Sequence, residues 1–177
     1  MDEPILNRVA ASGIVTLDLE EYHSDRPRHM LDIAPWLWQG MVLREKEFRD
    51  FVAAHDWEPY RAGAVAVFCS EPDAIVQTWA WMLIGTRLAQ VDAFFVVGSA
   101  EELEKELFRQ ALASVDIEAL RGLRVVLKGC SKHPVPASAY GELAARLTPI
   151  VQSLMFGEAC SAVPVYKKKK EAPAPTA

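Results

Sequence analysis

The most telling stretch of this chain is Ala64-Val-Ala-Val-Phe-Cys69, a short apolar run in which valine alternates with alanine. A run of this length without polar residues is typical of a strand buried on both faces of a sheet. Two further runs have the same character, Ala93-Phe-Phe-Val-Val97 and Arg124-Val-Val-Leu-Lys128. Helical stretches separate the three runs, and this alternation predicts an α/β fold with a parallel sheet and right-handed crossovers.

Two of the expected helices start at recognisable capping sequences. Ser70-Glu-Pro-Asp73 and Ser99-Ala-Glu-Glu102 each place an acidic residue three positions after a serine, which is the pattern of an N-terminal cap. The helices that we expect run approximately over residues 44–54, 70–89, 99–114 and 138–155.

The N-terminal part predicts additional strands. Gly13–Tyr22 alternates apolar and polar residues, and His29–Ile33 can return beside it after a turn-like stretch. We therefore expect one α/β domain over residues 1–166, with a mainly parallel sheet, helices packed on it, and N-terminal antiparallel strands. Residues 167–177, rich in lysine, proline and alanine, are expected to form a disordered tail.

Composition and charge exclude several classes of protein. The 177 residues are 51% hydrophobic and carry a net charge of −5. Lys167–Lys170 add four positive charges and Glu171 one negative charge, so residues 1–166 carry −8. An acidic body argues against nucleic-acid binding, which needs a basic face. No apolar run reaches the roughly 18 residues that span a bilayer, so we expect no membrane insertion. The first residues lack the features of a secretory signal, which predicts a cytoplasmic protein.

Three cysteines, each followed by serine, are the candidate site residues: Cys69, Cys130 and Cys160. Cys69 and Cys130 follow predicted parallel strands, and ligands of open α/β sheets bind beyond the carboxyl ends of the strands. The stretch Cys130-Ser-Lys-His133 adds an imidazole. With His133 the three thiolates make a Cys₃His set for zinc, and without it they can hold an iron–sulfur cluster with one open iron.

Two alternatives stay open for these cysteines. Free cysteines often act as small buried hydrophobic residues, and this interpretation suits a non-catalytic binding or interaction module. The paired tryptophans at 36, 38, 79 and 81 would then be core contacts or the contacts of a homodimer. A thiol near a helix N-terminus ionises more easily, which would suit an enzyme that uses Cys130 as its nucleophile. Three widely spaced cysteines do not indicate a disulfide framework.

Several polar residues near strand ends have both a functional and an ordinary interpretation. The acids Asp18, Glu20 and Glu21 can ligate a cation or form a solvated face, and His23 is expected to be exposed in a polar turn. The turn at Gly98-Ser99 can cradle an anion or serve as an ordinary strand–helix connection.

Four stretches of the chain carry a family resemblance: Leu43-Arg-Glu-Lys-Glu-Phe48, His55-Asp-Trp57, Lys128-Gly-Cys-Ser131 with Pro134-Val-Pro136, and Gly157-Glu-Ala-Cys-Ser161 with Val163-Pro-Val-Tyr166. With them the chain, from about Ile5 to Lys167, resembles an uncharacterised bacterial family, domain of unknown function 2480. The family has no established activity and supplies no catalytic residues. Its genes often neighbour iron–sulfur assembly genes, so the resemblance implies an accessory role in cluster assembly, with iron–sulfur assembly proteins as partners. It also favours a cluster over zinc.

Overall fold

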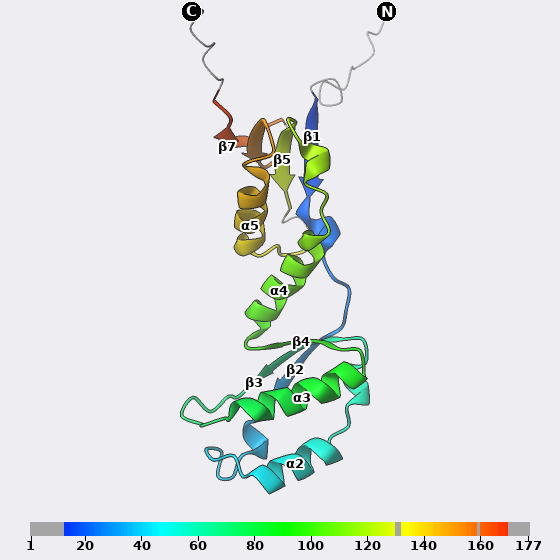
Figure 1. Ribbon diagram of the computed structural model, residues 1–177, viewed down its shortest axis with the longest axis vertical. Coiled ribbons are helices and arrows are strands. Elements are labelled where there is room, and N and C mark those ends of the chain that lie inside the picture. Colours follow the sequence, from blue (N-terminus) through cyan, green and yellow to red (C-terminus); the bar gives the residue numbers. More distant parts are fainter. Residues whose placement is uncertain (1–12, 130–131, 159, 170–177) are drawn as a thin grey trace, which may run out of the picture. The chain divides into compact units, whose positions relative to one another are not determined.

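A computed structural model describes residues 13–129, 132–158 and 160–169, and the chain divides into two compact units (Figure 1). Unit 1 comprises the chain up to His23 together with the chain from Phe108 onward, and unit 2 comprises Ser24–Leu107. Helix α4 (Ala100–Ala113) contributes residues to both units.

Unit 1 is built on a sheet with the strand order β1-β5-β6-β7. The strands are β1 (Ile14–Asp18), β5 (Arg124–Lys128), β6 (Ser153–Phe156) and β7 (Val163–Lys167). β1 and β6 each pair with β5 in parallel, whereas β7 pairs with β6 antiparallel. Helix α5 (Ala137–Leu147) and the end of α4 bury the apolar side of this sheet, with Leu127, Leu143 and Leu154 in the core.

Unit 2 is built on a fully parallel sheet with the strand order β2-β3-β4. Its strands are β2 (Arg28–Asp32), β3 (Ala64–Phe68) and β4 (Phe94–Val97), and its helices are α2 (Glu45–Ala54) and α3 (Thr78–Gln90). β3 is buried on both faces, because Val65 and Val67 pack toward α2 and α3 while Ala64 and Ala66 pack against α4. Short 3₁₀ turns complete the two units at Leu19–Tyr22, Ala34–Trp36, Glu58–Tyr60 and Glu118–Leu120.

The predicted α/β class and the mostly parallel pairing are confirmed, and the predicted N-terminal antiparallel strands are wrong. β1 pairs in parallel with β5, and β2 pairs in parallel with β3, so the first two strands belong to different sheets. The antiparallel pair is C-terminal, between β6 and β7. The division into one domain and a tail stays a prediction.

Two of the expected helices differ from the observed ones. The helix expected over residues 138–155 ends at Leu147, because Pro149 has no amide hydrogen to continue the helical hydrogen bonds, and the following residues form β6. Helix α3 begins at Thr78, and the residues before it include Ile75, which forms a β-bridge with Val42. The cap at Ser99 is confirmed, with Ser99 and Glu102 bonded reciprocally.

Across the residues that the structure describes, none of the helices combines the length and the apolar character needed to cross a bilayer.

Candidate functional site at the carboxyl edge of the unit 1 sheet

Charged side chains meet where the parallel strands β1 and β5 end. The register pairs Asp18 with Lys128, and the Lys128 ammonium lies 3.0 Å from Oδ2 of Asp18. The hydrogen bond from Lys128 to Asp18, followed by the charge of that carboxylate, raises the pKa of Lys128 above its usual range. The carboxylates of Glu158 and Glu20 raise the pKa further. The edge therefore concentrates carboxylates from three segments around one ammonium group.

Two imidazole rings stack at the same edge. The rings of His23, after β1, and His133, after β5, lie 4.1 Å apart between centroids and are tilted by only 6°. The amide of Lys132 donates to Oε1 of Glu20 at 3.0 Å. These contacts hold the start of the β5–α5 loop against the turn that follows β1.

One atom of this imidazole pair is buried without a partner. Nδ1 of His23 has no hydrogen-bond partner within the described part of the chain, and the ring lies 6.2 Å from that of Phe108 between centroids, with the two planes tilted by 53°. An unpaired buried polar atom costs about 1–3 kcal/mol, so such atoms are few in folded proteins.

The backbone at the end of β5 is closely covered by α5. A methyl group added at Gly129, where φ is +152°, would lie 2.5 Å from the hydroxyl oxygen of Tyr140 and 3.2 Å from Cγ2 of Val135. Tyr140 also packs edge-on against Phe156 of β6, with 5.4 Å between ring centroids. Tyr140 therefore contacts the ends of both β5 and β6, next to Gly129, the residue that precedes Cys130.

The predicted ligands divide between the two units. His133 lies at the carboxyl edge of unit 1, Cys160 is exposed in the turn after β6, and Cys130 lies outside the described residues. Cys69 belongs to unit 2, where its thiol lies 3.6 Å from the carbonyl oxygen of Glu71. Within residues 13–129, 132–158 and 160–169 no three His, Cys, Asp or Glu side chains are grouped closely enough to hold a metal. The four-ligand set stays a prediction.

Sequence reasoning missed three contributors to this edge. It treated Asp18 as a solvated residue or cation ligand without assigning Lys128 as its partner, it expected His23 to be exposed, and it did not single out Tyr140. The position of Asp18 and Lys128 as last residues of two predicted strands was an available signal, since parallel neighbours end at one edge. No local signal reveals Tyr140, because its role depends on how α5 packs.

The corresponding edge of unit 2 is closed by its own polar groups. Asp32 accepts hydrogen bonds from the amides of Ser70 and Ala34, both at 3.0 Å. Burial raises the pKa of Asp32, but the hydrogen bonds from Ser70 and Ala34 outweigh it and leave the pKa lowered. At the start of α4, the Glu102 carboxylate accepts from the Ser99 amide at 2.7 Å, so it occupies the place where an anion would bind.

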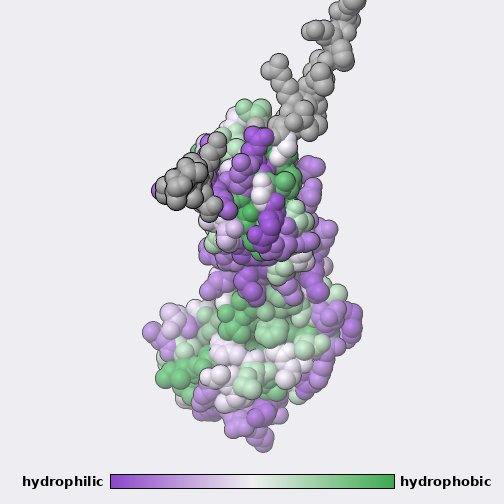
Figure 2. All heavy atoms as spheres, turned by 45° about the horizontal axis from the view of Figure 1, so that its top comes forward, coloured by the Kyte–Doolittle hydropathy of each residue, from purple (hydrophilic) through white to green (hydrophobic). Residues whose placement is uncertain are grey.

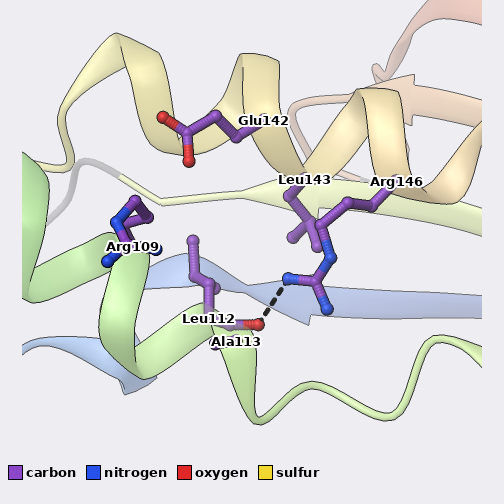
Figure 3. Close-up of a pocket in the computed structure, with 6 residues that line it drawn as sticks. All are labelled: Arg109, Leu112, Ala113, Glu142, Leu143 and Arg146. Atoms are coloured by element: carbon purple, nitrogen blue, oxygen red, sulfur yellow. Dashed lines mark hydrogen bonds between the residues drawn. The ribbon is translucent and has the colours of Figure 1, made fainter.

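A pocket of about 280 Å³ lies between α4 and α5 in unit 1 (Figure 3). Arg109 of α4 and Glu142 of α5 line it from opposite sides, and Leu112 and Leu143 contribute apolar atoms. The Arg146 guanidinium donates to the carbonyl oxygen of Leu112 at 2.6 Å, and thereby caps the C-terminal end of α4. The pocket thus contains an arginine with a structural role, which makes it a weaker candidate than the carboxyl edge.

The comparisons with known proteins give one match. A family model described as protein of unknown function (DUF2480) matches residues 3–168. No curated protein and no solved structure matches the chain.

Proposed function

The chain belongs to the DUF2480 family, whose function is unknown, and on that premise we propose that it binds a thiophilic metal ion or an iron–sulfur cluster. The site is the carboxyl edge of the unit 1 sheet, and its ligands are Cys130, Cys160 and His133. This set keeps the three sequence-predicted ligands that belong to unit 1 and does not need Cys69.

The pairing of β5 with β6 is the observation that carries this proposal. The two strands are parallel neighbours, and the Gly157 amide still donates to the carbonyl oxygen of Leu127 at 2.9 Å beyond the end of β6. Cys160 follows Gly157 by three residues, and Cys130 follows Leu127 by three residues. Cys130 and Cys160 therefore each follow, within three residues, a backbone segment that is hydrogen-bonded to the other segment.

The chemistry of the edge supports a cation. Thiolate and imidazole are the ligands that zinc and iron–sulfur centres prefer. Asp18, Glu20 and Glu158 all raise the pKa of Lys128, so three carboxylates act at this edge and favour a positive ion there. Three protein ligands leave one coordination position open, as in metal sites that exchange or bind a further group.

An accessory role in cluster assembly follows from such a site. A cluster held by few protein ligands at an exposed edge can be handed to another protein, and Cys160 is exposed. We propose proteins of iron–sulfur assembly as the partners, in line with the neighbourhood of the family's genes.

Metal analysis of the full chain tests the proposal. The protein purified without oxygen should carry stoichiometric iron or zinc, and the iron form should show charge-transfer absorption. Cys130→Ser, Cys160→Ser and His133→Ala should each lose metal, while Cys69→Ser, the matched control in unit 2, should keep it. Absence of metal in the unaltered chain would refute the proposal, as would equal retention in all four variants.

The same variants separate the alternative functions. If the metal-free chain shows rapid and selective alkylation of Cys130 at neutral pH, the thiol-enzyme interpretation gains support. If all three thiols are inert and the serine variants lose only stability, the cysteines are structural.

A further inference from the structure

Three large apolar side chains form an exposed row in unit 2. Trp38 bridges Val42 antiparallel, through the Trp38 amide to the Val42 carbonyl at 2.8 Å, and Val42 bridges Ile75 in parallel. Residues that face each other across β-bridges project to the same side. Trp38, Val42 and Ile75 therefore lie side by side on one face of a small three-segment ladder, which we call the Trp38 row.

The Trp38 row is exposed to an unusual degree for apolar residues. Ile75 is 76% exposed, Val42 48% and Trp38 39%. Scattered exposed apolar residues are ordinary, but contiguous ones mark interaction surfaces. Figure 2 shows hydrophobic side chains reaching the surface of unit 2 beside hydrophilic ones.

The row is held in place before any partner binds. The Arg44 guanidinium lies 3.9 Å from the centre of the Trp38 ring and is itself paired with Glu47 at 3.1 Å. The bridge hydrogen bonds fix the backbone under Val42 and Ile75. Few side chains then have to become ordered when a partner binds, which lowers the entropic cost of binding. Tryptophan and arginine are also among the residues that contribute most of the binding energy in protein interfaces.

The charges at the rim select the kind of partner. Glu71 and Asp73 are exposed in the loop that carries Ile75, and the Glu71 side chain lies against Gly40, within the loop that joins Trp38 to Val42. Acidic residues at this rim disfavour an anionic lipid surface. They also disfavour a second copy docked through the same row, because it would bring another set of these acids to the interface, and Arg44 is already paired with Glu47.

We propose that the Trp38 row docks a segment of another protein that presents apolar side chains flanked by lysine or arginine. The apolar side chains cover Trp38, Val42 and Ile75, and the basic flanks pair with Glu71 and Asp73. The row lies in unit 2 and the proposed metal site in unit 1, so this inference stands independently of the proposed function.

Two labelled synthetic peptides test the inference by fluorescence anisotropy with the full chain. They share a central Leu-Val-Leu segment, which is flanked by lysines in one peptide and by glutamates in the other. The lysine-flanked peptide should bind more tightly, and Ile75→Ser or Trp38→Ala should weaken its binding by about tenfold or more. Met82→Ser, which changes a residue of α3 that is 67% exposed and outside the row, is the matched control and should not weaken it.

Charge reversal provides the second arm of the test. Glu71→Lys combined with Asp73→Lys should reverse the preference between the two peptides. Equal binding of both peptides, or equal effects of Ile75→Ser and Met82→Ser, would overturn the proposal. So would sedimentation showing that the chain is a dimer that Ile75→Ser converts to a monomer, because the row would then hold a second copy.

Discussion

Replacing Gly129 by alanine tests the close packing at the end of β5. The new methyl group would lie 2.5 Å from the Tyr140 hydroxyl oxygen, well inside ordinary contact, and φ at this position is +152°. Overpacking costs about 1–3 kcal/mol and a backbone conformation reserved for glycine costs about 1–3 kcal/mol. We therefore expect Gly129→Ala to lower the free energy of unfolding of unit 1 by about 2–6 kcal/mol.

Two further glycines provide the controls for this substitution. Gly122 has φ +74° but no atom within 4 Å of an added methyl group, so Gly122→Ala should cost only backbone strain, about 1–2 kcal/mol. Gly141 lies within α5 with equally open space, so Gly141→Ala should stabilise the chain by about 0.5–1 kcal/mol.

Urea unfolding followed by far-ultraviolet circular dichroism measures these changes. All five tryptophans lie in unit 2, so tryptophan fluorescence in the same titration reports whether unit 2 unfolds with unit 1. Adding Tyr140→Phe to Gly129→Ala removes the hydroxyl that the new methyl group meets. In a double-mutant cycle it should restore the share of the unfolding free energy that is lost to overpacking. If Gly129→Ala costs no more than Gly122→Ala, or if the cycle shows no coupling, Tyr140 does not cover this backbone as described.

Three predictions concern unit 2 and α4. Phe48→Ala removes a fully buried ring and should cost about 3–5 kcal/mol, measured by urea unfolding. Ser99→Ala or Glu102→Ala should cost about 0.5–2 kcal/mol by breaking the cap of α4, and the double variant should cost less than their sum if the two act reciprocally. Burial lowers the pKa of His55, so the folded state binds fewer protons than the unfolded state, and stability should fall as the pH drops below 6.5 toward the folded pKa. His55→Gln should flatten that dependence, and it also removes the contact between Nε2 of His55 and the Tyr60 hydroxyl.

The strands that are buried by tertiary structure were the easiest to predict. The strand predicted over Arg124–Lys128 has the same bounds as β5, because a short run of β-branched and apolar residues is typical of a buried strand. β6 was missed because Ser153–Phe156 is very short. Over four residues the spacing of apolar side chains does not distinguish a strand from the end of a helix. The partner of β1 was missed because strand pairing is set by tertiary packing, and β5 lies far along the chain.

The candidate site was predictable only in part, for related reasons. The rule that ligands bind at the carboxyl ends of parallel strands directed attention to the loop with His133, where the structure places the ring of His133 against that of His23. It did not reveal that Cys69 follows a strand of a different sheet from β5 and β6, because the sequence of a strand does not indicate which sheet the strand joins. Likewise, the stacking of His23 on His133 depends on the parallel pairing of β1 with β5.

X-ray absorption spectroscopy of the metal-loaded full chain tests the central claim most directly, because it counts the sulfur and nitrogen ligands of the bound ion. For zinc we predict two sulfurs at about 2.3 Å and at least one imidazole nitrogen at about 2.0–2.1 Å, with the sulfur count unchanged in Cys69→Ser. A shell of oxygen and nitrogen alone, or a sulfur lost on replacing Cys69, would contradict a site formed by Cys130, Cys160 and His133.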